Sequence, residues 1–281
     1  MGYQRIRVNP IAGALGAEIE GVDMGQPLGN QVFQEVHDAL MAHQVIFFRD
    51  QDITPAQHVA FARQFGELHV HPYAPSHRDH PEVLILRSSK ANRSAANAWH
   101  SDVTFQEEPP LGSILLAREV PEHGGDTMWA NMYAAYETLS EPMKRYLEGM
   151  TAHNTAGRAQ FEKAYDKLSD SEKKDIHDGR MAEQGAHHPV IRTHPVTGRK
   201  ALYVNSIFTQ RLDGVSSRES RAILGYLNEH LQKPEFTCRF RWQKGSVAFW
   251  DNRCTQHYAI ADYGDATREM HRVTVCGDRP Y

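Results

Sequence analysis

The sequence predicts a mainly β protein in which helices pack around an antiparallel barrel or sandwich. Three observations lead to this prediction. Short runs of strand character dominate the C-terminal third, helical periodicity concentrates in the N-terminal part and the middle, and strands and helices do not alternate regularly. Because its 281 residues contain no repeat, low-complexity tract or long linker, we expect a single domain spanning 1–281.

The N-terminal part is predicted to form a helix, a strand and a second helix. Apolar residues recur at helical spacing over 32–41 and lead directly into Val45-Ile46-Phe47-Phe48, a short run of strand character. Thr54 and Pro55 then supply an N-cap and a first-turn proline for a helix that ends at Gly66.

The middle of the chain is predicted to contain strands at 83–87 and 114–118, followed by a helical stretch from about 132 to 150. From about 154 to 185 the pattern is polar and only weakly helical. We interpret this segment as a helical, variable insertion that lies over a sheet.

The C-terminal part is predicted to begin with a β-hairpin. Pro195-Val196-Thr197-Gly198 provides turn residues between strands at 189–193 and 201–205. A helix is expected from about 217 to 232. Three further strands are expected at 236–242, 246–250 and 272–276.

Composition excludes several classes of protein. The net charge is -4 and the basic residues form no stripe, so we expect no nucleic-acid partner. The N-terminus has no apolar signal region, and no window approaches the ~18 apolar residues that a membrane span needs. Three cysteines without a C-x-x-C spacing argue against disulfides and a structural zinc site. We therefore expect a cytoplasmic protein without a membrane partner.

The stretch Trp99-His100-Ser101-Asp102-Val103-Thr104-Phe105 contains two metal-ligating residue types inside a run that resembles a strand. On a strand, His100 and Asp102 would point to the same face. An imidazole and a carboxylate suit iron(II), manganese or zinc, but two ligands do not hold a transition metal selectively. Taken alone, the triplet is more often a hydrogen-bonded pair than a metal site.

A third ligand candidate, His257, follows an apolar strand some 155 residues downstream, where a barrel would return it to the first pair. Two histidines and one carboxylate form the facial triad of non-haem iron(II) oxygenases, which leaves three coordination positions open. A bidentate 2-oxo acid can occupy two of these positions and dioxygen the third.

Arg268 and Arg272 are candidates to bind anions near this site. A guanidinium binds a carboxylate through two charge-assisted hydrogen bonds. Their four-residue separation places both on one side of an extended segment, so that one could hold the 2-oxo acid and the other a second anion. The alternative is that both are exposed charges on a strand.

Four segments in this order resemble the taurine/2,4-D family of Fe(II)/2-oxoglutarate dioxygenases: WHSDVTF at 99–105, GGDTMWAN at 124–131, WDNRCTQH at 250–257 and REMHRVTV at 268–275. The resemblance extends from near residue 13 to the end of the chain. It implies a double-stranded β-helix (jelly roll, cupin-like), with Fe(II), 2-oxoglutarate as co-substrate and O2. It also implies a homo-oligomer, either a dimer or a tetramer.

By this resemblance, His100, Asp102 and His257 would bind iron, while Thr127 and Arg268 would hold the distal carboxylate of 2-oxoglutarate. The resemblance implies a substrate site as well. Arg272 and His71 would bind its anionic group, the Val103 amide would donate a further hydrogen bond, and Phe208, Phe161 and Tyr73 would lie around the remainder.

The chain departs from the family pattern near the substrate. Ala74 stands where a tyrosine is usual, with Tyr73 one place earlier, and 94–98 reads Ser-Ala-Ala-Asn-Ala instead of an Asp/Asn-rich sequence. The implied reaction is hydroxylation of the carbon next to the anionic group of a small, taurine-like organic sulfonate, releasing sulfite, an aldehyde, succinate and CO2. Because these departures remove polar groups near the substrate's amine end, an alkyl sulfate ester or an aryloxyalkanoate is the alternative.

Two other classes of function remain open at this stage. A non-catalytic jelly roll could use the same three ligands to sense a metal or a small acid, and a zinc hydrolase could use them without oxygen. The remaining histidines at 187, 188 and 194 are expected to be surface or capping residues.

Overall fold

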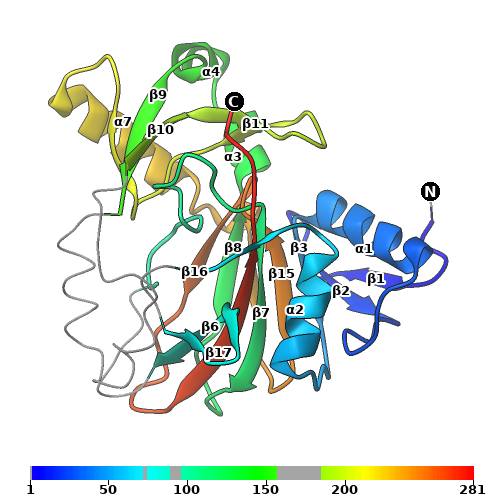
Figure 1. Cartoon of the computed structure of the whole chain (residues 1–281). Helices are drawn as coiled ribbons and strands as arrows, with labels where there is room; N and C mark the ends of the chain where they lie inside the picture. Colours follow the sequence, from blue (N-terminus) through cyan, green and yellow to red (C-terminus); the bar gives the residue numbers. More distant parts are fainter. Residues whose placement is uncertain (1, 72–74, 89–95, 157–184) are drawn as a thin grey trace.

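Two mainly antiparallel sheets face each other across an apolar core, and helices cover the outer face of the larger sheet (Figure 1). The computed structural model of the chain describes residues 2–71, 75–88, 96–156 and 185–281. The predicted mainly β fold with surrounding helices, a jelly roll, is confirmed.

The larger sheet is built from strands that are distant in sequence. Its central strands follow the order β3-β15-β7-β17-β6, and every pair in the sheet is antiparallel except β2 with β3. Its strands are β1 (Arg7–Pro10), β2 (Ala17–Glu20), β3 (Val45–Phe48), β4 (Leu68–His69), β5 (Ser76–His77), β6 (His80–Ser88), β7 (Gly112–Glu119), β15 (Val247–Asp251) and β17 (Arg268–Val275).

The smaller sheet has the order β14-β8-β16, with β14 at Thr237–Phe240, β8 at Thr127–Asn131 and β16 at Thr255–Ala259. Trp129 on β8 lies directly opposite His257 on β16, and Thr127 lies opposite Ala259. Because opposite residues share a face and alternate residues along a strand do too, Thr127, Trp129 and His257 all point toward the larger sheet.

The core between the sheets is rich in aromatic side chains. Phe47 of the larger sheet stacks on Phe240 of the smaller one with ring centroids 4.0 Å apart, and Trp129 packs on Trp250 at 5.8 Å. Burying each such side chain contributes about 1.5–3 kcal/mol or more, so this core holds the sheets together. Its buried members are Leu15, Val45, Phe47, Leu115, Ala117, Trp129, Cys238, Phe240, Trp242, Ala248, Trp250 and Met270.

Helices α1 (Asn30–His43) and α2 (Pro55–Arg63) cover the outer face of the larger sheet, as the apolar periodicity predicted. The predicted start of α2 is confirmed in detail. Thr54 accepts a hydrogen bond from the Gln57 amide while the Gln57 side chain accepts one from the Thr54 amide, which forms a capping box.

The predicted helical stretch from about 132 to 150 is divided between two helices in the structure. Helix α3 (Met132–Glu137) ends at Thr138, and the Ser140 hydroxyl caps a new helix, α4 (Glu141–Leu147), by accepting from the Met143 amide. A serine that binds its neighbours' backbone favours a cap over a helix interior, which explains the break.

Helices α3 and α4 share an apolar cluster with Ala130 of the smaller sheet and with α7 (Ser217–His230), which matches the predicted helix at 217–232. The predicted hairpin is confirmed as β11 (Ile191–Thr193) and β12 (Lys200–Leu202). A three-stranded sheet in this region was not predicted. It consists of β10 (Gly185–Pro189), β9 (Thr151–Thr155) and β13 (Thr209–Leu212).

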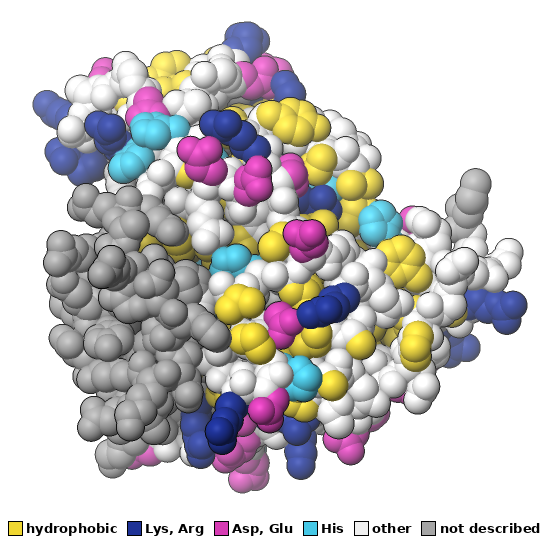
Figure 2. Space-filling model, in the orientation of Figure 1, with side chains coloured by type: hydrophobic (Ala, Val, Ile, Leu, Met, Phe, Trp, Pro, Cys, Tyr) yellow, Lys and Arg dark blue, Asp and Glu magenta, His cyan; other side chains and the backbone are white. Residues whose placement is uncertain are grey.

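Most of the predicted insertion, 157–184, lies outside the described residues. A short 3-10 helix (Pro234–Phe236) precedes β14. Within the described residues no helix has both the length and the apolar character needed to cross a bilayer. Figure 2 shows that basic and acidic side chains are interspersed over the visible face.

Candidate active site

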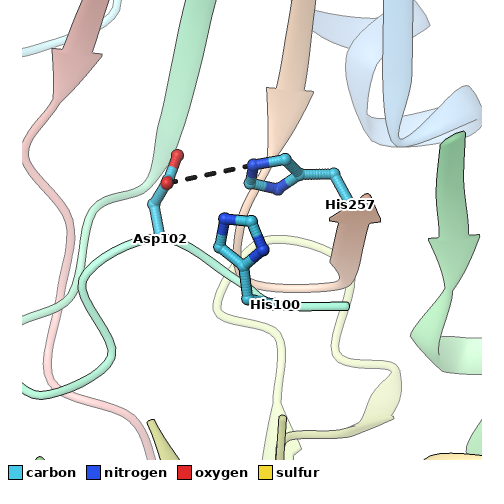
Figure 3. Close-up of side chains that lie close together, drawn as sticks. All are labelled: His100, Asp102 and His257. Atoms are coloured by element: carbon cyan, nitrogen blue, oxygen red, sulfur yellow. Dashed lines mark ion pairs between the residues drawn. The ribbon is translucent and has the colours of Figure 1, made fainter. Parts of the chain in front are cut away.

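His100 and His257 are brought together by their own backbones. Each residue's amide donates to the other's carbonyl, at 3.1 Å and 2.8 Å, in an isolated antiparallel bridge that extends β16. Their ring centroids lie 4.1 Å apart, and the Asp102 carboxylate faces both rings (Figure 3). The three side chains predicted to bind a metal therefore meet at one point between the two sheets.

The predicted strand geometry for 99–105 is wrong, although the convergence of His100 and Asp102 is right. Residues 102–105 form a turn, and Val103 adopts the left-handed region with φ of +56°. A β-branched residue rarely adopts this conformation, which costs of order 1–3 kcal/mol and is tolerated mainly at functional sites. His100 and Asp102 therefore converge without strand alternation.

The protonation states of His100, Asp102 and His257 match those that bind a divalent metal. Burial lowers the pKa of His257 to about 3, with His100 lowering it further, and burial also lowers the pKa of His100. Burial would raise the pKa of Asp102, but Arg272 and the two histidines outweigh burial and hold it well below its usual value. At neutral pH the cluster is two neutral imidazoles and one carboxylate, the forms that bind metals.

Hydrogen bonds leave the metal-facing atoms available. His100 Nδ1 lies 2.8 Å from the Ala98 carbonyl, so Nδ1 carries the hydrogen and Nε2 keeps its lone pair. One candidate ligand atom from each of the three side chains lies within 4.8 Å of the others, and all three residues are buried. Two imidazole nitrogens and one carboxylate oxygen fit iron(II), manganese or zinc, so the residues present suit the implied metal.

A second buried group in the described part of the chain, His194, Asp251 and Cys254, has similar residue types. His194 Nδ1 accepts from the amides of Val196 and Thr197, and Nε2 lies 3.0 Å from Asp251. Both nitrogens are therefore occupied, and this group is structural. His194 caps the hairpin turn as expected, but it is buried and not on the surface.

His187 and His188 differ in their surroundings. His187 is exposed and pairs with Asp213 at 2.6 Å, as expected for a surface residue. His188 is 2% exposed and lies 2.9 Å from the Gln106 carbonyl, so the expectation of a surface position is wrong for His188.

Thr127 and Arg268, the predicted 2-oxoglutarate ligands, are both buried and are joined through Trp242. The Trp242 indole donates to the Thr127 hydroxyl at 2.9 Å, and the Arg268 guanidinium carbon lies 5.9 Å from the centre of the Trp242 ring. No carboxylate of the described residues forms an ion pair with Arg268, although this residue is only 6% exposed. A buried guanidinium without a counter-ion fits a bound anion.

The turn before Thr127 requires glycines. Gly124 and Gly125 have φ of +77° and +73°, and a side chain at Gly124 would lie 2.6 Å from an Asp262 carboxylate oxygen. The same carboxylate accepts a hydrogen bond from the Gly125 amide, and Arg268 Nε donates to the Gly125 carbonyl at 3.2 Å. The glycine pair thereby places Arg268 beside the start of β8.

Arg268 and Arg272 lie on the same face of β17, as predicted. Met270 between them belongs to the core, and Leu115 lies directly opposite Arg272. Four residues of strand separate the Cα atoms of the two arginines by about 13 Å. Arg272 lies beside the cluster, with Nη1 donating to Asp102 Oδ1 at 2.7 Å. Neither arginine is an exposed strand charge.

Of the other side chains predicted to contact the substrate, Phe208 and His71 lie within the described residues. Phe208 is half-buried, with its ring centroid 6.4 Å from that of His100. His71 is half-buried, and burial followed by Arg272 lowers its pKa to about 3. Tyr73 and Phe161 lie outside the described residues.

Sequence reasoning missed three residues that line this region. Phe105 packs on Phe208 with ring centroids 5.3 Å apart. His69 lies directly opposite Thr274 on β17, and Arg272 contributes to lowering its pKa after burial. Ser113 donates to Asp102 Oδ2 at 2.8 Å. Phe105 belongs to the quoted motif and His69 precedes His71 by two residues, whereas a serine inside an apolar strand gives no signal.

Comparisons with known proteins agree with this geometry. Residues 7–274 match the family model described as "Taurine catabolism dioxygenase TauD, TfdA family". The chain is 38% identical over 276 residues to the alpha-ketoglutarate-dependent sulfate ester dioxygenase of Pseudomonas putida, covering 97% of this chain and 90% of that protein.

Two solved structures are similar over nearly the whole chain. A taurine dioxygenase from Burkholderia xenovorans has a TM-score of 0.84 and 38% identity, covering 99% of this chain and 91% of that one. AAD-2 in complex with Mn(II) and N-oxalylglycine has a TM-score of 0.80 and 30% identity, covering 99% of both chains.

The fold and the three-residue centre define a non-haem iron dioxygenase that depends on 2-oxoglutarate and O2. Within that class the chain belongs to the TauD, TfdA family of taurine catabolism dioxygenases.

Proposed function

We propose that the enzyme hydroxylates the carbon next to the anionic group of a small organic sulfonate or sulfate ester, with an apolar organic group in preference to taurine. His100, Asp102 and His257 would hold iron(II), and Thr127 and Arg268 would bind the distal carboxylate of 2-oxoglutarate. When bound, iron with 2-oxoglutarate and O2 supplies an oxidant that can remove hydrogen from an unactivated carbon. The remaining task of the chain is to position the substrate.

The observation that carries this proposal is the position of Arg272. Its Nη1 donates to Asp102, while its buried Nε has no hydrogen-bond partner among the described residues. An unpaired buried donor costs about 1–3 kcal/mol, so an anionic oxygen supplied by the substrate would remove a penalty. An anion held there lies beside a metal ligand, and the carbon attached to the anion is then the one nearest the metal.

The walls near the centre favour an apolar organic group. Phe105 and Phe208 form an aromatic pair next to His100. An ammonium group that lost water against these rings without a partner would be unfavourable by several kcal/mol. Ala96, in the segment where the family pattern is rich in Asp and Asn, has no side chain that could solvate an ammonium group. An alkyl group therefore suits this side of the site better than the amine of taurine.

The geometry assigns a role to each group around the substrate. Arg272 would bind the anion, His71 would add a hydrogen bond, and the aromatic pair would exclude water from the reacting carbon. The hydroxylated product then breaks down because it carries a leaving group on the same carbon. The hydroxyl loses its proton, a carbonyl forms, and the bond to the leaving group breaks. A sulfonate loses sulfite through C–S cleavage, whereas a sulfate ester loses sulfate through C–O cleavage.

The sulfate ester is a candidate of equal standing because a 38% identical relative is named for sulfate esters. Both head groups present three anionic oxygens on a tetrahedral sulfur, which one guanidinium and one imidazole can bind alike. The two differ in the product released, so a product assay separates them.

A substrate panel tests the proposal. Purified enzyme with Fe(II), ascorbate and 2-oxoglutarate would be supplied with hexyl sulfonate, hexyl sulfate, taurine and a phenoxyacetate, and succinate, sulfite and sulfate would be measured. We expect succinate with at least one hexyl compound at a kcat/KM well above that for taurine. Preference for phenoxyacetate or taurine would overturn the proposed substrate class. Hydrolysis without O2 would overturn the reaction type.

A further inference from the structure

Asp102 lies at the end of a chain of buried hydrogen bonds that begins at Trp250. The Trp250 indole donates to Asn252 Oδ1 at 2.8 Å, and Asn252 Nδ2 donates to Ser113 Oγ at 3.5 Å, the longest step. Ser113 Oγ then donates to Asp102 Oδ2 at 2.8 Å. The chain joins two segments of the sequence, 250–252 and 102–113, at the metal centre.

Trp250 fixes which atom donates and which accepts in each of these hydrogen bonds. An indole N–H can only donate, so the carbonyl oxygen of the Asn252 amide must face Trp250. The Asp102 backbone amide approaches the same oxygen at 3.5 Å, which agrees with that orientation. The NH2 group of Asn252 consequently faces Ser113, whose oxygen accepts, and the Ser113 hydroxyl hydrogen is left to point at Asp102.

Water cannot easily replace these bonds. Ser113 is 0% exposed, Trp250 and Asn252 are 1% exposed, and Asp102 is 4% exposed. In so dry an environment a carboxylate oxygen with a dedicated donor keeps its orientation. The Oδ2 atom of Asp102 therefore stays hydrogen-bonded to Ser113.

The other oxygen is the one that faces the centre. Asp102 Oδ1 lies 4.0 Å from His257 Nε2 and 2.7 Å from Arg272 Nη1. If the carboxylate binds the metal through one oxygen, three coordination positions stay open. If it binds through both oxygens, only two remain for the co-substrate and dioxygen. The orientation of this one side chain thus affects what the centre can bind.

We propose that Ser113 is a positioning residue that holds Asp102 by Oδ2 and presents Oδ1 to the metal, and that Trp250 and Asn252 set the direction of the Ser113 hydroxyl. This assigns a function to two residues of the 250–257 segment that bind neither metal nor substrate. Ser113 acts only through Asp102.

Metal affinity measures this role without catalysis. The probe is Mn2+ alone, and its dissociation constant would be measured by chelator competition with the full-length metal-free protein. Ser113→Ala is expected to weaken Mn2+ binding about tenfold, as loss of a group that orients a ligand usually does. Ser246→Ala is the matched control, because Ser246 is also 0% exposed and its hydroxyl accepts from Arg49 and the Gln243 amide without touching Asp102. This control should leave the affinity unchanged.

A double-mutant cycle distinguishes an effect transmitted through the Trp250–Asn252–Ser113 hydrogen bonds, here called the Ser113 relay, from a general loosening of the core. Trp250→Phe keeps most of the ring and removes the indole donor, so we expect a smaller loss of Mn2+ affinity. In the Ser113→Ala background the Trp250→Phe change should have no further effect, because it acts through the missing hydroxyl. A core role alone would make the two effects additive.

Wild-type Mn2+ affinity in Ser113→Ala, or additive losses in the cycle, would overturn the proposal. Asp102→Ala serves as the reference for the ligand itself. If Asp102→Ala also kept full affinity, the assignment of the metal ligand would fail, a result that is distinct from failure of the Ser113 relay.

Discussion

Two buried histidine–aspartate clusters lie close together in this protein, and they differ in how completely their polar atoms are paired. In the structural cluster, His194 uses both ring nitrogens and Asp251 binds both His194 and Arg253. In the cluster of His100, Asp102 and His257, the His257 Nε2 atom lies 4.0 Å from Asp102 Oδ1, beyond hydrogen-bond distance, so Nε2 stays available to a metal. The residue types are nearly the same, but only the second cluster leaves room for a ligand.

This difference shows what distinguishes a binding site from a stabilising network. A buried polar group without a partner is costly, so its presence indicates either strain or a missing ligand. The same reasoning applies to the arginines: Arg253 is paired with Asp251 at 2.7 Å, whereas Arg268 forms no ion pair with a described residue. Of these two buried arginines, the one without an ion pair is the one predicted to bind an anion.

The largest expected effect separates the two clusters by histidine substitution. His257→Ala should abolish 2-oxoglutarate turnover with every substrate, a loss well beyond the about 100-fold seen when only a supporting residue is removed. His194→Ala should leave Mn2+ affinity unchanged and lower thermal stability. Succinate release and Mn2+ titration measure both variants. Equal loss of metal binding in the two variants would contradict the proposed difference between the clusters.

Removing the charge of Asp251 is expected to have the next largest effect, on stability only. Asp251→Asn leaves the buried Arg253 guanidinium without its counter-ion, which typically destabilises by about 3–5 kcal/mol. Urea unfolding of the variant measures this loss. Mn2+ affinity of the fraction that remains folded should match wild type, and a parallel loss of affinity would place Asp251 in the metal centre.

Arg272→Ala tests the division of roles between the two anion-binding arginines. We expect KM for the sulfonate or sulfate substrate to rise about 100-fold, because a charge-assisted hydrogen bond contributes about 1.5–3 kcal/mol. Substrate-independent decarboxylation of 2-oxoglutarate should persist, whereas Arg268→Ala should raise KM for 2-oxoglutarate instead. If both variants impaired the same step equally, the assigned roles would be wrong.

A buried histidine outside both clusters is expected to have no effect at neutral pH and to act only in acid. Burial lowers the pKa of His58 to about 3, and its Nε2 lies 3.2 Å from the Ile114 carbonyl. The unfolded chain takes up the proton first as pH falls below about 6.5, so folding stability should fall from there toward pH 3, by about 1.4 kcal/mol per pH unit. Stability above pH 6.5 is unaffected by this group.

His58→Gln keeps a donor for the Ile114 carbonyl and cannot titrate, so it is the matched variant. Urea unfolding at pH 6, 5 and 4 should show a shallower decline for His58→Gln than for the wild type. Parallel declines would mean that His58 is already charged in the folded protein.

The sequence predicted that His100, Asp102 and His257 would form one cluster because these residue types are distinctive, but it did not predict how they converge. His100, Asp102 and His257 follow from residue type, order and spacing. Strand alternation was the wrong local reason, since Val103 turns the chain in a conformation that no propensity favours for valine. Local pattern cannot show a strained turn that the surrounding fold imposes.

The missed elements have a similar cause. β9 consists of Thr-Ala-His-Asn-Thr and is held by pairing with β10 and β13, not by an apolar period. β16 likewise owes its form to β8 and to its bridge with His100. Ser113 gave no signal, because its importance comes from its hydrogen bond to Asp102 and not from its neighbours in the chain. Tertiary contacts decide each of these features.

An anaerobic crystal structure of the enzyme with Fe(II) and 2-oxoglutarate tests the central claim most directly. We predict one iron bound by His100 Nε2, Asp102 Oδ1 and His257 Nε2 at about 2.0–2.2 Å, close to the bond lengths of other divalent metals. Asp102 Oδ2 should remain on Ser113, and the distal carboxylate of 2-oxoglutarate should lie on Arg268 and Thr127. Iron bound at His194 and Asp251, or held by both oxygens of Asp102, would contradict this account.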